Sequence, residues 1–224
     1  MKQTNTVAAR LLAAAAPIWD GYHSHPFVRG IADGSLETEK FRYYLVQDYL
    51  YLFDYARVFA QGVVKARHPA HMRAFARYVH QILDGEMNIH KAYMARLGIA
   101  PETAETAVPA LDNLSYTGYM RAVAAEEGPA EILAAILSCA VSYEHIARRI
   151  VQEYPNAAEH PFYGEWVAGY ASDSYAAENR ALEDLLEELA AGYDETGLAR
   201  LTEIFCVCSR YEMAFWDMAW EMRA

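Results

Sequence analysis

A carboxylate lies among tyrosines in the segment VQDYLYLFDYARVF, residues 46–59. Asp54 in this segment has Arg57 three residues further on, which places a partner for its charge on the same helix face. Asp48 has no such partner. Its helical neighbours are all uncharged: Tyr44, Leu45, Tyr51 and Leu52. A buried carboxylate must find a hydrogen-bond partner or shift its pKa. Asp48 is therefore either an acid that recognises a ligand, or a group that is solvated at a helix edge or paired with an arginine from elsewhere.

The spacing around Asp48 predicts one continuous stripe of phenols. Tyr44, Asp48, Tyr51 and Tyr55 follow the pattern i, i+4, i+7, i+11, which lies on one face of a helix. The chain has 17 tyrosines in all. Stacked phenols and one acid suit a small, planar, nitrogen-rich aromatic ligand, because the rings cover its faces and the acid accepts from an amino group or a protonated ring nitrogen.

A cysteine is the second group that could do chemistry. Cys139 and Tyr143 are four residues apart in the apolar segment ILSCAVSYEHI, residues 136–146. A free cysteine in such surroundings is either a small, inert core residue or a nucleophile. The second interpretation requires a nearby group that raises the thiolate fraction.

An acid in the last segment could move protons. Glu212 shares a helix face with Phe215, Trp216 and Ala219 in SRYEMAFWDMAWEM, residues 209–222. A glutamate with a pKa raised by apolar surroundings can transfer protons near neutral pH. The alternative is a glutamate on the exposed flank of an aromatic helix.

A metal site between helices is typically built from histidines and carboxylates at the i, i+3 or i, i+4 spacing, on one helix face. Glu86 and His90 form an i, i+4 pair in EMNIH, but a helical di-metal centre needs a second such pair. Glu144 and His145 are adjacent in sequence, and residues 166–182 contain no histidine. The sequence therefore predicts no metal site, and a structural hydrogen bond between helices for Glu86 and His90.

Helical periodicity must position all of these residues, because strand-like alternation is almost absent. Glycine and proline divide the 224 residues at short intervals. Pro129 suits the first position of a helix. The pattern predicts one all-α domain, residues 1–224, of about eight helices. We place these near residues 6–20, 38–66, 69–97, 110–126, 130–153, 162–171, 174–191 and 195–222. Residues 130–143 and 203–220 are apolar nearly all round, which favours an oligomer.

The composition excludes several classes of protein. A net charge of −11 repels phosphate backbones and argues against nucleic-acid binding. Three cysteines without a CxxC motif indicate a reducing compartment. The uncharged stretch at residues 132–143 is much shorter than the roughly 20 residues that cross a bilayer. The alanine-rich start is typical of a first helix rather than a signal peptide. We expect a soluble cytoplasmic protein with no membrane partner.

The segment HPFVRGIADGSLETEKFRYYLVQDYLYL, residues 25–52, resembles the N-terminal signature of the TenA family, also called thiaminase II. The resemblance continues in order through almost the whole chain. It includes EMNIH, LSYTGYM (114–120), the 139–143 segment, HPFYGEWVAGYAS (160–172) and EMAFWDMAW (212–220).

The resemblance implies a haem-oxygenase-like helical bundle that assembles as a homotetramer. It implies hydrolysis of 4-amino-5-aminomethyl-2-methylpyrimidine to the 5-hydroxymethyl compound and ammonia for thiamine salvage, with cleavage of thiamine itself as a further activity. No metal or organic cofactor is implied. Cys139 is similar to the nucleophile of the cysteine-containing branch of the family.

Roles for single residues also follow from the resemblance. Cys139 matches the nucleophile that adds to C6 of the pyrimidine, and Glu212 matches the acid and base. Asp48 matches the carboxylate that holds the amino group and ring nitrogen, and Tyr51 matches the residue that supports the cysteine. The phenols that line the pocket match Tyr116, Tyr143 and Tyr163, with Tyr170 as a second candidate on the same segment as Tyr163.

The chain departs from the family pattern around the cysteine. Ser138, Ala140 and Val141 stand where many members have proline and bulkier aromatic residues, which leaves the substrate preference open. Two other classes remain. One is a transcriptional regulator or pyrimidine-binding protein without hydrolysis, and the other is a helical di-iron oxygenase on the same fold.

Overall fold

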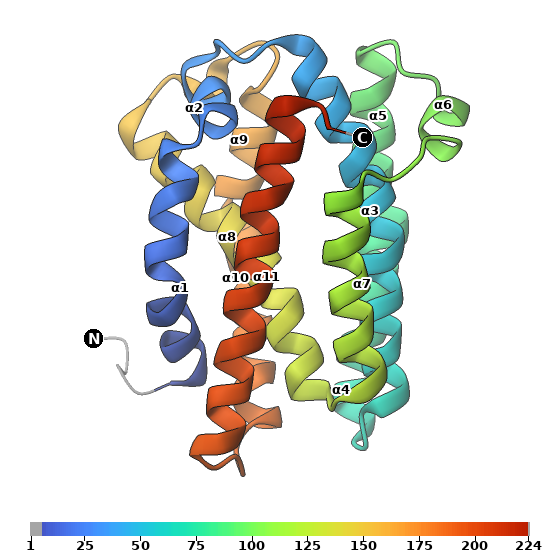
Figure 1. Cartoon of the computed structure of the whole chain (residues 1–224), viewed down its shortest axis with the longest axis vertical. Coiled ribbons are helices and arrows are strands. Elements are labelled where there is room, and N and C mark those ends of the chain that lie inside the picture. The colour runs from blue at the N-terminus through green and yellow to red at the C-terminus, as the bar shows by residue number, and fades with distance from the viewer. Residues whose placement is uncertain (1–5, 224) are drawn as a thin grey trace. The chain divides into compact units, whose positions relative to one another are not determined.

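A computed structural model describes residues 6–223, apart from the side chains of Pro101 and Glu105, and within this range the chain forms helices and no β-strand (Figure 1). The all-α prediction is therefore confirmed. The chain separates into two compact units. The first unit comprises Met1–Leu36 and Leu133–Trp216, and the second comprises Glu37–Ile132 and Asp217–Ala224. The expectation of one domain over residues 1–224 stays a prediction.

The first unit is built from six α-helices and a short 3-10 turn. Its helices are α1 (Val7–Ser24), α2 (Pro26–Asp33), most of α8 (Pro129–Glu153), α9 (Gly164–Ala171), α10 (Asp173–Leu189) and most of α11 (Glu195–Glu221), with the turn at Ala157–Glu159. The predicted helix start at Pro129 is confirmed. Helix α10 begins at a cap in which the Ser172 hydroxyl accepts from the Tyr175 main-chain N–H.

Helix α2 falls in a segment in which we predicted no helix. Its start is fixed by His25, whose side chain accepts from the Phe27 main-chain N–H, and by a proline at the first helical position. Gly30 lies inside the helix because Leu36 packs against it, so that an added Cβ would lie 2.9 Å from the Leu36 Cβ. Gly34 ends the helix with φ of 78°, a left-handed conformation that glycine adopts without strain.

The second unit is organised around one long helix. Its helices are α3 (Thr38–Lys65), α4 (Pro69–His80), α5 (Met87–Arg96), α6 (Pro101–Glu105) and α7 (Leu111–Glu126). A π-helical segment, Gln81–Glu86, joins α4 to α5. Helices α4, α5 and α7 all pack against α3. Pro69 and Pro101 occupy the first positions of α4 and α6, where their missing N–H costs nothing.

The phenol stripe that the spacing predicted on α3 faces the interior, an orientation that the sequence had left open. Tyr44, Asp48, Tyr51 and Tyr55 are all buried. The rings of Tyr51 and Tyr55 stack with centroids 5.3 Å apart. Burial of each such aromatic side chain stabilises the fold by roughly 1.5–3 kcal/mol.

The number of helices differs from the prediction of about eight. Residues 6–223 contain eleven α-helices. The predicted helix at 69–97 is interrupted by the π-helical segment, and α2 and α6 are additional. The segments on the two sides of the π turn each have helical periodicity and no proline separates them, which is why the sequence pattern merges the three elements into one.

Helix α8 is long and apolar enough to cross a membrane by length and composition alone. However, 83% of its most apolar window is buried within the protein, as in the core helix of a globular fold. Its apolar character therefore has an explanation within one chain. The predicted homotetramer stays a prediction.

Candidate active site

Asp48 forms a buried pair with a histidine from another helix. The Asp48 Oδ2 atom on α3 lies 2.6 Å from Nε2 of His90 on α5. Both residues are only 6% exposed. The Tyr44 hydroxyl, one turn before Asp48, donates to the same Oδ2 over 3.4 Å. Asp48 is thus neither solvated nor paired with an arginine, and its partner is a residue for which we predicted a structural hydrogen bond between helices.

The hydrogen bonds of His90 define its protonation state. Nδ1 lies 3.0 Å from the main-chain oxygen of Glu86, which can only accept, and Nε2 faces the Asp48 carboxylate. With Asp48 ionised, both ring nitrogens must donate, so His90 is an imidazolium. Burial acts to lower the His90 pKa, but the hydrogen bond and charge of Asp48, with the charge of Glu86, outweigh it and raise the pKa to about 9.

Two further predicted site residues lie together in the second unit. The rings of Tyr51 on α3 and Tyr116 on α7 are 5.2 Å apart between centroids. The Tyr51 hydroxyl lies 3.5 Å from the Met120 sulfur, which is a weak acceptor. Tyr51 is 3% exposed and Tyr116 is 1% exposed, so α3 and α7 present these phenols to the interior.

Alongside burial, Cys139 and Glu212 both raise the pKa of one residue of the first unit, Tyr22. Burial raises the pKa of Tyr22 on α1 well above its ordinary value, followed by the charge of Glu212, and Cys139 and Cys208 contribute to the same rise. The Tyr22 hydroxyl donates to the Ser209 main-chain oxygen over 2.5 Å. Glu212, from the same turn of α11 as Ser209, is 2% exposed. The structure therefore assigns Glu212 to the interior and not to an exposed flank.

The three cysteines are free thiols in different surroundings. Burial, followed by the charge of Glu212, raises the pKa of Cys208 far above its ordinary value, although a hydrogen bond with Ser138 opposes this shift. Burial also raises the pKa of Cys206. Cys139 is partly exposed. Cys208 is thus held as a thiol, which leaves the predicted nucleophile as the partly exposed cysteine on α8.

Aromatic rings surround the second predicted residue of α8. The Tyr143 ring lies 4.8 Å from the ring of Tyr170, 5.4 Å from that of Trp216 and 5.8 Å from that of Trp166. The hydroxyl of Tyr163 instead donates to the Leu36 main-chain oxygen over 2.5 Å. Of the two tyrosines considered for this segment, Tyr170 thus has its ring against Tyr143, and Tyr163 has its hydroxyl on the Leu36 main chain.

Each unit thus gathers its own set of predicted site residues. The second unit holds Asp48, Tyr51 and Tyr116, and the first holds Cys139, Tyr143, Tyr163 and Glu212. The convergence of both sets on one ligand stays a prediction. Sequence reasoning missed His90 as the partner of Asp48 and missed Tyr22 beside Glu212. His90 could have been found from its place in EMNIH, whereas Tyr22 lies in no motif that we identified.

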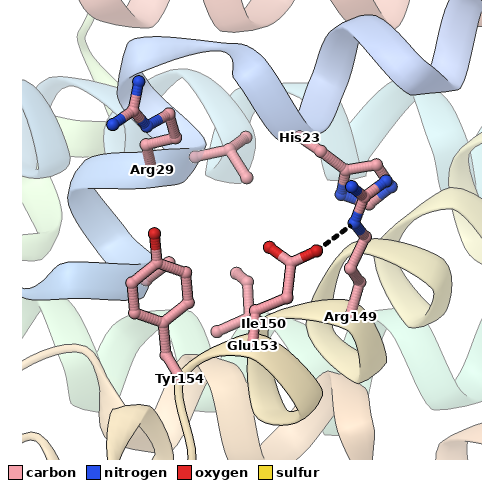
Figure 2. Close-up of a pocket in the computed structure, with 8 residues that line it drawn as sticks. His23, Arg29, Arg149, Ile150, Glu153 and Tyr154 are labelled. Atoms are coloured by element: carbon pink, nitrogen blue, oxygen red, sulfur yellow. Dashed lines mark hydrogen bonds and ion pairs between the residues drawn. The ribbon is translucent and has the colours of Figure 1, made fainter.

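No group of three or more histidine, cysteine or carboxylate side chains within residues 6–223 is arranged to hold a metal ion. A separate cavity of about 180 Å³ lies in the first unit, lined by side chains of α1, α2 and α8 (Figure 2). Figure 2 shows Glu153 with one carboxylate oxygen turned to Arg149, and the Arg149 Nε lies 2.6 Å from it. None of the predicted site residues lines this cavity.

Known proteins resemble this chain over nearly its whole length. The model of the TENA/THI-4/PQQC family matches residues 12–222. An aminopyrimidine aminohydrolase of Halalkalibacterium halodurans is 44% identical over 216 residues, which is 96% of each chain. An aminopyrimidine aminohydrolase of Helicobacter pylori is 45% identical over 215 residues, which is 96% of this chain and 99% of the relative.

Solved structures agree with the helical fold. The TenA homologue from P. horikoshii superposes with a TM-score of 0.87 at 29% identity, covering 97% of this chain and 99% of the other. A TenA family transcription regulator from a Silicibacter species has a TM-score of 0.88 at 28% identity, covering 96% of both chains. A Shewanella denitrificans domain with a haem-oxygenase-like fold has a TM-score of 0.75 at 14% identity, covering 96% of this chain and 92% of the other. The predicted haem-oxygenase-like fold is therefore confirmed.

Proposed function

The chain belongs to the TENA/THI-4/PQQC family, and on this premise we propose that it is an aminopyrimidine aminohydrolase, a hydrolase of C–N bonds. The observation that carries the proposal is the identity of 44% and 45% to two relatives of that name over nearly the whole of each chain. The substrate is 4-amino-5-aminomethyl-2-methylpyrimidine, and the products are the 5-hydroxymethyl compound and ammonia, for thiamine salvage. Thiamine is a second candidate substrate.

Recognition of the pyrimidine is the role of the second unit in this proposal. Asp48 accepts a hydrogen bond from the 4-amino group of the ring. The buried phenols of Tyr51 and Tyr116 provide aromatic surface for a planar ligand. Tyr51 also supports the reactivity of the cysteine.

Bond cleavage is the role of the first unit. The Cys139 thiolate adds to C6 of the ring while Glu212 protonates a ring nitrogen, so the ring loses its aromaticity and the C5 methylene expels ammonia. Water then adds to the methylene carbon and the thiolate leaves C6, which restores the aromatic ring. Glu212 takes the proton of the ring nitrogen back as the exocyclic methylene forms and passes it to the amine, which leaves as ammonia. Glu212 then regains a proton from the attacking water, so the carboxylic acid and the thiolate are both restored at the end of the cycle. The buried position of Glu212 supports this role, because apolar surroundings favour an acid that exchanges protons near neutral pH.

Tyr143 and one tyrosine of residues 160–172 complete the proposed pocket. Tyr163 is the residue that we predicted, but its hydroxyl is hydrogen-bonded to the Leu36 main chain. Tyr170, whose ring contacts Tyr143, is the alternative. We further propose that the protein is a cytoplasmic homotetramer that needs no cofactor.

Release of ammonia tests the function. The wild type is expected to hydrolyse 4-amino-5-aminomethyl-2-methylpyrimidine, and Cys139→Ser is expected to lose about 10³-fold or more in kcat because a hydroxyl is a far weaker nucleophile than a thiolate. Cys206→Ser is the matched control, since Cys206 is also a partly exposed free cysteine, and it is expected to keep full activity. A wild type that releases no ammonia would overturn the proposal.

Transcription regulation is a second candidate function, because the Silicibacter protein of the same fold is called a transcription regulator. Direct DNA binding conflicts with the net charge of −11, because an acidic surface repels the phosphate backbone. A DNA-binding assay with a salt titration distinguishes the two functions. Binding that weakens steeply with salt would favour a regulator, whereas no binding beside ammonia release would favour the enzyme.

A further inference from the structure

We propose that His90 is a positioning residue that fixes the Asp48 side chain through Oδ2 and turns its other carboxylate oxygen toward the amino group of the substrate. The inference rests on the proposed function, because it needs Asp48 to bind the pyrimidine. His90 thereby gains a role toward the substrate that neither its sequence motif nor the similarity to known proteins gives it.

The geometry of the carboxylate supports this role. Both hydrogen bonds to Asp48, from His90 and from Tyr44, end on Oδ2. A carboxylate has about four acceptor positions, and those of Oδ1 are not used by these two bonds. A donor on Oδ2 therefore fixes the rotation of the side chain and directs Oδ1 to a ligand.

The protonation of the histidine supports it independently. The Glu86 main-chain oxygen accepts from Nδ1, which leaves Nε2 for Asp48 and fixes the plane of the ring. The charged and titratable groups that act on His90 are Asp48 of α3 and Glu86 of the π-helical segment, and both favour the imidazolium. The pair carries no net charge. A neutral aminopyrimidine can therefore bind to Asp48 without leaving an unpaired charge in the interior.

A second histidine–aspartate pair, which is exposed, shows how burial changes the effect of losing one partner. His80 and Asp84 also lie 2.6 Å apart, but their side chains are 76% and 66% exposed. Water screens and solvates that pair, so little depends on it. The His90–Asp48 pair has the same distance and almost no exposure, so removal of one partner leaves a buried charge that the protein must neutralise. The exposed pair therefore provides a matched control.

Kinetics of His90 variants test the inference. His90→Gln keeps a donor for Asp48 without the charge, and His90→Ala removes both. We expect KM to rise about 10-fold in the first and about 100-fold in the second, with kcat changed much less, as when other supports of a functional side chain are removed. We also expect the basic limb of kcat/KM to change, because the wild-type His90 imidazolium loses its proton near its pKa of about 9 and neither variant carries that group. His80→Gln is expected to match the wild type in every measurement.

The imidazole resonances give a readout that does not depend on activity. In the wild type, the ring protons of His90 are expected to stay in the imidazolium form through pH 8, and in Asp48→Asn they are expected to titrate at lower pH. A merely structural histidine would tolerate His90→Gln without a change in the pH profile.

The outcomes separate the two proposals. If the wild type releases ammonia and His90→Gln keeps both the KM and the basic limb of the wild type, the role of His90 is overturned and the function stands. If His90 titrates near its ordinary pKa in the wild type, the role is also overturned. If the wild type releases no ammonia, the function fails and this inference fails with it. Should His90→Ala not fold, His90→Gln still decides.

Discussion

The interiors of the two units treat ionisable groups in opposite ways. In the second unit, Asp48 and His90 form a charged pair, and the His90 pKa is raised to about 9. In the first unit, burial keeps groups neutral. It raises the pKa of Tyr22 and of Cys208, and it lowers the pKa of His23 to about 4.

The difference matches two chemical tasks. A group that only holds a ligand works best with a fixed charge and a fixed orientation, which a paired carboxylate has. Burial keeps Tyr22 and Cys208, which both interact with Glu212, in their neutral forms, so no phenolate or thiolate of these residues competes with the acid that we propose transfers protons. The proposal therefore gives recognition to the second unit and proton transfer to the first.

The largest expected effect comes from removing the group that we propose transfers protons in the first unit. Glu212→Gln keeps the size of the side chain but removes its ability to transfer protons, so kcat is expected to fall about 10²–10⁴-fold with a small change in KM. Steady-state kinetics of ammonia release measure this. A variant in which KM rises and kcat holds would show that Glu212 binds substrate instead, and would reverse the assignment.

The next effect is the pH dependence of stability due to the charged pair. The folded pKa of His90 lies above the unfolded value of about 6.5, so its contribution is complete below that pH and is lost as the pH rises through about 9. The loss is about 3 kcal/mol in the free energy of unfolding. Urea unfolding at pH 6 to 9.5 measures it. Asp48→Asn is expected to flatten this part of the curve, and an unchanged slope in that variant would contradict the pairing.

A smaller effect distinguishes the two tyrosines of residues 160–172. Tyr163→Phe removes the hydrogen bond to the Leu36 main chain and is expected to lower the free energy of unfolding by about 1 kcal/mol, with KM unchanged. Tyr170→Phe is the comparison. A raised KM in Tyr163→Phe at wild-type stability would instead support its predicted role in the pocket.

The smallest effect concerns the neutral histidine of the first unit. Burial, followed by the charges of Arg149 and His145, lowers the His23 pKa, so its neutral form contributes fully above about pH 6.5. This contribution is lost as the pH falls toward 4. His23→Leu is expected to make stability less sensitive to pH in that window. An unchanged acid dependence in thermal unfolding would rule out this role.

Much of the fold could be predicted because it depends on local pattern. Helix α8 begins at Pro129 as expected, since proline at this position has no N–H to lose. That Tyr44, Asp48, Tyr51 and Tyr55 share one face of α3 followed from their spacing, whereas the burial of that face did not. Helix α2 was missed because its two glycines suggested a turn, whereas Gly30 serves close packing against Leu36 and only Gly34 ends the helix.

The sequence identified candidate residues of the site by their types and spacing, but it did not identify which residues contact one another. Spacing along α3 identifies Asp48 as an unusual acid, but its partner is 42 residues away on α5. The hydrogen bond from the Tyr163 hydroxyl to the Leu36 main-chain oxygen joins residues that are 127 positions apart in the sequence. Such contacts depend on tertiary packing, and periodicity within one helix contains no information about them.

The π-helical segment Gln81–Glu86 has a consequence for the changes of length that this chain can tolerate. It supplies the main-chain oxygen that holds His90, and it sets the angular position of α5 relative to α4. Each residue of a helix turns the chain by about 100°, so deletion of a single residue here would rotate His90 away from Asp48 unless the helix slipped to compensate. Insertions and deletions in this connection are therefore constrained by an electrostatic pair, whereas a surface loop of equal length would tolerate them.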